Sequence, residues 1–317
     1  MTEHLTLASW ATNLAVPLRG IEAWAAAVDG QMAAAKAQGA DILLMPEYAA
    51  EQWLSFAPAD LAPEAEIAWM ADRAPAALDL IKPLPRKHGM ALLAGTMPAR
   101  LDRPAPGRPP HVNRAWLLLP DGRAIAQDKL CLTPGEQNPA GWNLATGSQI
   151  EIVAWRGVRL AVLICLDIEM PALASLLAPC DVDMILVPSM TEKLSGYSRV
   201  FSCAKARAVE LMTAVAPVGC IGKAAASKPR LSNTSGAAVY VPCEEALGHT
   251  GVFADLPATD RAEGPGPVLL ARDIPIGLMR QLRHGKAEVW PGAWRADHVR
   301  IVDAAGSAVR QAAKAAS

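Results

Sequence analysis

Near the middle of the chain stands the sequence Leu160-Ala161-Val162-Leu163-Ile164-Cys165-Leu166-Asp167. Its apolar run is flanked by Arg159 and Asp167, which predicts a buried strand of ordinary length. Cys165 then lies where that strand ends and the chain must change direction. In α/β enzymes, ligands bind outside the carboxyl ends of the strands, so a thiol at this position is a candidate nucleophile.

Two other stretches end in the same way. One is Leu43-Leu44-Met45-Pro46-Glu47, which ends on a carboxylate, and the other is Ala124-Ile125-Ala126-Gln127-Asp128-Lys129, which ends on an ammonium. A thiol with an ordinary pKa of about 8.5 is mostly protonated near neutral pH and needs a base or a cation beside it. Attack on a carbonyl or nitrile carbon also requires a donor for the developing oxyanion. Glu47, Lys129 and Cys165 together supply a base, a cation and a nucleophile without a histidine.

The rest of the chain alternates predicted helices and strands. Helices are predicted at residues 21–38, 63–80, from Pro171 onward and at 197–212, and Pro75 is expected to kink or split the second of them. Strands are predicted at 5–16, 41–45, 90–96, 184–188, 214–221, 237–241 and 268–274, with hairpins at 115–128 and 150–164 and a surface loop at 98–110. Strands that come partly as hairpins, with helices between strand pairs, predict an α/β fold with mixed sheets and helices outside.

Composition excludes several classes of function. The 317 residues carry a formal net charge of −1, and no basic stripe favours nucleic acid or an anionic membrane surface. No apolar run approaches the roughly 20 residues that span a bilayer, and the first residues lack the pattern of a signal peptide, so a cytoplasmic location is expected. The six cysteines are expected to be free thiols, and the histidines show no zinc-ligand spacing.

No linker or internal repeat divides the chain. We therefore predict one domain over residues 1–298. An Ala-rich segment follows at 299–317, and it is expected to be a tail or an oligomer contact.

Four blocks resemble the nitrilase superfamily of carbon–nitrogen hydrolases. They are Leu44-Met45-Pro46-Glu47-Tyr48, then residues 128–136 (Asp-Lys-Leu-Cys-Leu-Thr-Pro-Gly-Glu), then residues 162–171 (Val-Leu-Ile-Cys-Leu-Asp-Ile-Glu-Met-Pro), then Ile185-Leu186-Val187-Pro188-Ser189 followed by Ala206-Arg207-Ala208-Val209-Glu210. Each block alone is a weak signal, but four blocks in the family's order are a strong one. The resemblance extends to about residue 290.

This resemblance implies a four-layer α-β-β-α sandwich that pairs into a homodimer or a higher even oligomer. It also implies the roles of the site residues. Glu47 would be the general base, Lys129 would stabilise the oxyanion, Cys165 would be the nucleophile, and Glu136 would orient the lysine and the substrate. The backbone N–H of Leu166 would be a second oxyanion donor. Neither a metal nor another cofactor is implied.

Several positions depart from the common family pattern and leave the substrate class open. Leu166 stands where an aromatic residue often follows the nucleophile, and Met170-Pro171-Ala172 replaces the usual Phe-Pro-Glu. Gln127 and Cys131 stand where Tyr and His are common on either side of the lysine. Trp142, in the loop after Glu136, and Met190, after a predicted strand end, are candidate pocket walls.

The leading hypothesis is hydrolysis of a small-molecule amide through a Cys acyl-enzyme, with release of ammonia or an amine. It is preferred over a true nitrilase because Leu166-Asp167 follows the nucleophile, where nitrilases proper usually carry Trp-Glu. Hydrolysis of an N-carbamoyl amine, acyl transfer to an amine, and a binding-only role on the same fold stay open. A papain-like pair of Cys165 with His284 or His298 is the physical competitor, but it leaves Glu47 and Lys129 without a role.

Overall fold

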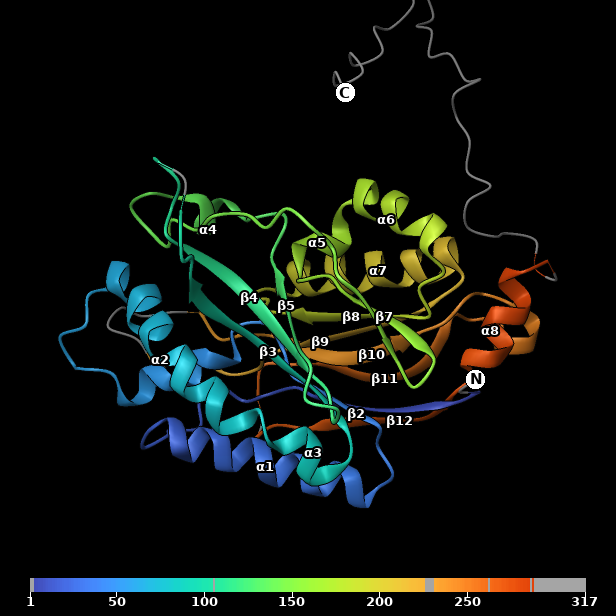
Figure 1. Ribbon diagram of the computed structural model, residues 1–317, viewed down its shortest axis with the longest axis horizontal. Helices are drawn as coiled ribbons and strands as arrows, with labels where there is room; N and C mark the ends of the chain where they lie inside the picture. The colour runs from blue at the N-terminus through green and yellow to red at the C-terminus, as the bar shows by residue number, and fades with distance from the viewer. Residues whose placement is uncertain (1–2, 105, 226–230, 262, 286, 288–317) are drawn as a thin grey trace, which may run out of the picture.

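Two mixed sheets of six strands each form the centre of the molecule (Figure 1). The structure is a computed structural model that describes residues 3–104, 106–225, 231–261, 263–285 and 287. The first sheet has the order β12 (Val268–Ile274), β1 (Leu5–Trp10), β2 (Ile42–Leu44), β3 (Ala91–Arg100), β4 (His111–Leu118) and β5 (Ala124–Asp128). In it β1, β2 and β3 are parallel and the other pairs are antiparallel.

The second sheet repeats this arrangement. Its order is β11 (Val252–Thr259), β10 (Ser235–Tyr240), β9 (Ala214–Gly219), β8 (Met184–Ser189), β7 (Val158–Val162) and β6 (Ile152–Trp155). Here β7, β8 and β9 are parallel, and every residue of β8 and β9 is buried, which is why these two strands are almost entirely apolar.

Helices cover the outer faces of both sheets (Figure 1). The first sheet carries α1 (Ile21–Ala37), α2 (Glu66–Ile81) and α3 (Leu84–His88), and the second carries α5 (Leu166–Glu169), α6 (Pro171–Leu177) and α7 (Leu194–Leu211). Two further helices are the short α4 (Pro134–Gln137) after β5 and α8 (Ile276–Arg283) after β12. Short 3-10 helices are Ala49–Phe56, Pro63–Ala65, Ala178–Cys180 and Glu245–Leu247. The predicted α-β-β-α sandwich is therefore confirmed.

Side chains alternate between the two faces of the central strands, so one strand contributes both to the core between the sheets and to the core under the helices. On β2, Ile42 and Leu44 pack in the core between the sheets, whereas Leu43 packs against the helices α1 and α2. This is the period of two expected of a strand that is buried on both faces.

The two predicted hairpins are confirmed as β4–β5 and β6–β7, and three other predictions need correction. The first strand ends at Trp10 and not at Val16. The helix α2 runs through Pro75 without a break, with Pro75 on its solvent-exposed side. The predicted loop at 98–110 is shorter, since β3 extends to Arg100 and pairs with His111.

The predicted tail at 299–317 lies outside the described residues, so the division into one domain and a tail stays a prediction. Among the described helices, none combines the length and the apolar character that crossing a bilayer requires. All six cysteines are described, and none forms a disulfide.

Candidate active site

Glu47 lies two residues beyond Met45, in the turn that follows β2. A bulge in β3 supports this turn: Gly95 has φ +68°, and a Cβ there would lie 2.1 Å from the carbonyl oxygen of Pro46. Only glycine permits so close an approach. The next residue of β3, Thr96, accepts a 2.8 Å hydrogen bond from the backbone N–H of Tyr48 through its Oγ1. The first sheet therefore fixes the backbone on both sides of Glu47.

Cys165 lies beyond the end of β7, three residues after Val162, because the strand ends two residues before the predicted Ile164. Its backbone is in an unusual region for a non-glycine residue, with φ 49° and ψ −104°. The N–H of Cys165 donates to the carbonyl of Pro188 at 2.9 Å, so β8 holds it there. Leu166 begins α5, and its N–H is among those that a helix leaves without an internal partner.

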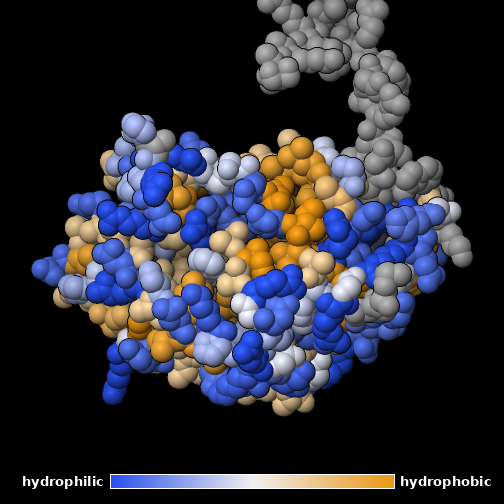
Figure 2. Space-filling view, viewed as in Figure 1, coloured by the Kyte–Doolittle hydropathy of each residue, from blue (hydrophilic) through white to orange (hydrophobic). Residues whose placement is uncertain are grey.

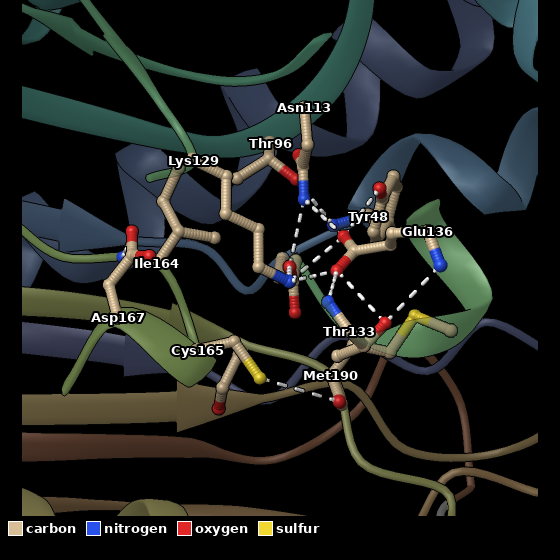
Figure 3. A network of polar contacts seen from close by, with 12 residues as sticks. Tyr48, Thr96, Asn113, Lys129, Thr133, Glu136, Ile164, Cys165, Asp167 and Met190 are labelled. Atoms are coloured by element: carbon tan, nitrogen blue, oxygen red, sulfur yellow. Dashed lines mark hydrogen bonds and ion pairs between the residues drawn. The ribbon is translucent and has the colours of Figure 1, made fainter. Parts of the chain in front are cut away.

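Lys129 follows β5 and extends its ammonium between two buried carboxylates (Figure 3). Its Nζ lies 2.7 Å from Glu47 Oε1, and 2.9 and 2.8 Å from the two oxygens of Glu136. All three side chains are almost completely buried. One cation shared by two carboxylates leaves the cluster with a net charge of −1, which is costly in a site of low polarity.

Glu136 owes its position to the first turn of α4. Thr133 and Glu136 form a capping box: the Thr133 N–H donates to Glu136 Oε2 at 2.8 Å, and the Glu136 N–H donates to Thr133 Oγ1 at 3.4 Å. The hydroxyl of Tyr48 donates to Glu136 Oε1 at 3.0 Å. The helix end therefore presents a fixed carboxylate to Lys129.

Asp167 ties the nucleophile to the lysine, a role that the sequence did not predict. Its carboxylate accepts an N–H bond from Ile164 at 3.0 Å (Figure 3). It also accepts one from Cys131 at 2.7 Å and a longer one from Leu130. Burial raises the pKa of Asp167 to about 6, although these hydrogen bonds oppose the shift. No local signal marks this role, because the donors near the lysine, Cys131 and Leu130, lie 36 and 37 positions away in the chain.

Asn113, on β4, is a second contributor that the sequence did not predict. Its Nδ2 donates to Glu47 Oε1 at 2.8 Å and lies 3.4 Å from Glu136 Oε1. The side chain is completely buried. The sequence does contain one indication of a polar contact here. The Asn113 amide lies between Val112 and Ala115 on a strand of mostly buried residues, and a buried amide needs a polar partner.

Burial and the neighbouring charges set the protonation of the cluster. Burial raises the pKa of Glu47 to about 7; the ion pair with Lys129 lowers it, and the charge of Glu136 raises it. Burial also acts to raise the pKa of Glu136, but Lys129, Thr133 and Tyr48 hold it below its ordinary value. For Lys129, burial acts to lower the pKa, and the two carboxylates overcome it and raise the pKa. The lysine is therefore a permanent cation, and Glu47 is the carboxylate that titrates near neutrality.

The thiol of Cys165 is neutral at rest. Burial, and then the negative charge of Glu47, raise the pKa of Cys165 well above its ordinary value. Sγ lies 3.7 Å from the carbonyl oxygen of Met190 (Figure 3), and a hydrogen bond from Cys165 to Glu47 lowers the pKa of that carboxyl. Attack by sulfur would therefore require transfer of its proton, and Glu47 is a base with a suitable pKa.

A cavity of about 700 Å³ opens onto these groups. All of the predicted site residues line it: Glu47, Lys129, Glu136, Cys165, Leu166, Trp142 and Met190. Trp142 packs edge-on against Tyr48, with ring centroids 4.7 Å apart. Charged groups at the cavity include Lys193 and the ion pair of Glu169 with Arg199. The structure thus brings the predicted residues together, and their chemical roles stay predictions.

A metal site and a Cys–His catalytic pair find no support in the described part of the chain. It contains no group of three or more His, Cys, Asp or Glu side chains that could hold a metal ion. His284 is exposed after α8 and does not line the cavity, and His298 lies outside the described residues. The geometry therefore offers Cys165 a carboxylate partner and not an imidazole.

Comparison with known proteins gives a consistent result. A family model described as carbon-nitrogen hydrolase matches residues 8–248. Probable hydrolase YhcX of Bacillus subtilis (strain 168) is 28% identical over 181 residues, which are 56% of this chain and 35% of that protein. An (R)-stereoselective amidase of Pseudomonas sp. is 35% identical over 75 residues, 24% of this chain and 26% of that protein. The chain thus matches about a third or less of the length of these relatives.

Solved structures share the fold over most of the chain. An amidase from Nesterenkonia sp. superposes with a TM-score of 0.64 and 22% identity, covering 89% of this chain and 94% of that one. A variant of that amidase, with the same TM-score, identity and coverage of this chain, covers 97% of its own and carries the acetamide moiety of fluoroacetamide on the active-site cysteine.

Proposed function

The chain belongs to the carbon–nitrogen hydrolase family, and on that premise we propose that it hydrolyses the C–N bond of a small amide through a thioester on Cys165. One observation carries the proposal. The Lys129 ammonium, held at 2.7 Å from Glu47 and 2.8 Å from Glu136, faces the same cavity as the Cys165 thiol. Acyl transfer to sulfur requires a thiol, a base that titrates near neutrality and a cation, and this cavity contains all three.

The first half-reaction forms the thioester. Glu47 takes the proton from Sγ as the sulfur attacks the amide carbon, and the carbonyl oxygen becomes an oxyanion. The ammonium of Lys129 and the N–H of Leu166 stabilise that charge. The tetrahedral intermediate then collapses, the C–N bond breaks, and the proton on Glu47 passes to the leaving nitrogen.

The second half-reaction returns the free enzyme. Glu47, ionised again, takes a proton from water, and the hydroxide attacks the thioester carbon. The C–S bond breaks, the carboxylic acid leaves, and the thiolate of Cys165 recovers its proton from Glu47. Glu47 thus works in both halves, and in the free enzyme burial raises its pKa to about 7.

The wall of the cavity supports an acyl group with apolar surface. Trp142, Tyr48, Leu166 and Met190 contribute apolar surface beside Cys165. Two proteins similar to this chain are named as amidases, from Pseudomonas sp. and Nesterenkonia sp.. A small-molecule amide with an apolar acyl part is thus the proposed substrate, with no nucleic acid or membrane partner and a cytoplasmic location.

We also propose that the protein forms a homodimer or a higher even oligomer across the face of α5 to α7. Figure 2 shows apolar side chains gathered over this region, and the most exposed large apolar side chains of the described chain include Leu176 of α6 and Leu194 of α7. Light scattering tests this proposal. Leu176→Asp should shift the mass toward the monomer, whereas Leu231→Asp, an equally apolar exposed position elsewhere, should leave it unchanged.

The test of function measures ammonia release from aliphatic, ω-dicarboxylic and aromatic amides, carbamoyl amines and nitriles. Wild type, Cys165→Ala and Cys243→Ala are compared, since Cys243 is an exposed thiol outside the cavity. Release that Cys165→Ala abolishes and Cys243→Ala retains supports the thiol mechanism. Release with carbon dioxide would favour the N-carbamoyl alternative, and release from nitriles alone would favour a nitrilase. No release, together with a Cys165 inert to iodoacetamide near neutral pH, would favour a binding-only protein.

A further inference from the structure

We propose that Asn113 is a positioning residue whose side-chain amide keeps Glu47 ionised and aligned with Cys165, an inference that rests on the proposed function. The amide lies between the two carboxylates of the cluster (Figure 3). Its Nδ2 donates to Glu47 Oε1 at 2.8 Å, and Glu136 Oε1 lies 3.4 Å from the same nitrogen.

The main chain of Asn113 holds a third member of the cluster. Its carbonyl oxygen accepts the backbone N–H of Lys129 at 2.9 Å. Asn113 therefore contacts both carboxylates through its side chain and the lysine through its backbone. A substitution of the side chain removes the first two contacts and leaves the backbone contact in place, so the two roles can be separated by experiment.

The direction of the amide follows from the charges that it faces. If the group were turned over, its oxygen would point at two carboxylates and be repelled. In the observed orientation the oxygen, Oδ1, is buried and has no hydrogen-bond partner among the described residues. A buried acceptor without a partner lowers the stability of the fold. The observed orientation therefore stabilises the two carboxylates and lowers the free energy of unfolding.

Asn113 acts through Glu47 and not on the substrate. It is completely buried and is absent from the lining of the cavity, whereas Glu47 and Cys165 both line it. A donor to a carboxylate stabilises its charged form. Loss of this donor would make Glu47 hold its proton to higher pH, so that a smaller share of the enzyme has a working base at a given pH below neutrality.

Asn113→Leu removes the donor and keeps the number and branching of the side-chain heavy atoms. Asn113→Ala also removes it but leaves space where water can donate instead, so its effect should be smaller and of the same sign. Asn233→Leu is the matched control. Asn233 is also a buried asparagine with an unpaired Oδ1, but its side chain bonds the backbone of Gly222 and lies outside the cavity lining.

The primary measurement is the pH dependence of Cys165 alkylation by iodoacetamide, followed on the Cys165 peptide by mass spectrometry. It needs no substrate. The acid limb is the pH range over which the rate rises as Glu47 loses its proton. We expect it to move to higher pH by about one unit in Asn113→Leu and by less in Asn113→Ala, because hydrogen bonds to charged groups are strong. Once a substrate is found, kcat/KM below the limb should fall about 10-fold, with KM little changed.

The outcomes separate the two proposals. An acid limb that stays at its wild-type pH in both Asn113 variants, with rates reduced only as in Asn233→Leu, overturns the role of Asn113 and leaves the proposed function intact. A wild-type Cys165 that is not alkylated near neutral pH contradicts the proposed function, and this inference with it. A limb that shifts upward in Asn113→Leu and Asn113→Ala but not in Asn233→Leu supports the inference.

Discussion

Asp167 and Cys131 are joined across the two sheets by a 2.7 Å hydrogen bond from the backbone N–H of Cys131 to the Asp167 carboxylate. Cys131 follows β5 of the first sheet, and Asp167 lies in α5, next to the second. Because Lys129 lies two residues before Cys131, and Cys165 two residues before Asp167, this bond fixes the lysine relative to the nucleophile.

Asp167→Asn should therefore reduce both stability and turnover. An amide has one acceptor oxygen where the carboxylate has two, and its NH₂ group would face backbone donors. We expect a loss of about 1–3 kcal/mol in the free energy of unfolding, measured with urea, and a fall in kcat/KM of at least about 10-fold. Asp183→Asn is the control, since Asp183 is a buried carboxylate that accepts the backbone N–H of Arg159 away from the cavity. Equal losses of turnover in both variants would contradict the specific role of Asp167.

Stability should decrease as the pH rises from about 4.5 to about 7, because the folded state binds the Glu47 proton more tightly than the unfolded state does. The pKa of this carboxyl is 4.5 in the reference state and about 7 when folded. Its contribution is therefore fully present below the lower value and lost as the pH passes the upper one. Urea unfolding at several pH values should show a loss on the order of 1–3 kcal/mol that is absent in Glu47→Gln. A variant with the wild-type pH dependence would show that other groups cause it.

Glu136→Gln should lower the rate but shift the acid limb of kcat/KM in the direction opposite to that of Asn113→Leu. The charge of Glu136 raises the pKa of Glu47, and both carboxylates share Lys129. Loss of that charge should move the limb to lower pH, while kcat/KM on the plateau falls about 10- to 100-fold because Lys129 is less well held. Thr133→Val, which removes the cap but keeps the charge, should leave the limb in place. An upward shift in Glu136→Gln would refute this account.

Trp142→Ala should raise KM for amides with bulky acyl groups and change kcat little. The indole packs against Tyr48 on the wall of the cavity, where it would contact the acyl group of the substrate, so it should bind ground state and transition state alike. Steady-state kinetics over a series of acyl lengths tests this, with Trp69→Ala as a control of equal volume outside the cavity. A fall in kcat at constant KM would instead place Trp142 in the chemical step.

Sequence patterns predicted the mixed sheets with helices outside, because the central strands are largely buried and therefore appear in the sequence as short apolar runs, whereas the four layers were implied by the family resemblance. Glu47, Lys129 and Cys165 stand out for the same reason, each being a reactive side chain just past such a run. The strand β11 was missed, since its residues are mostly half-buried or exposed and include Pro257, which weakens any periodic signal.

Asn113 and Asp167 could not be identified as members of the site from the sequence alone. Asn113 contacts Glu47 across 66 positions, and Asp167 contacts Cys131 across 36. Such contacts depend on the order of the strands in space, which local periodicity does not determine. The register β4–β5 places Asn113 near Lys129, and the packing of the two sheets places Asp167 near Cys131.

The cluster of Glu47, Lys129 and Glu136 belongs to the first sheet, whereas Cys165 follows a strand of the second. Between the sheets lies an apolar core that includes Leu44 and Leu160. The distance from base to sulfur is thus a property of that core, and a methylene gained or lost there moves the reactive groups relative to each other. Core substitutions remote from the cavity can therefore change or abolish the catalytic rate of related chains in which every reactive side chain is retained.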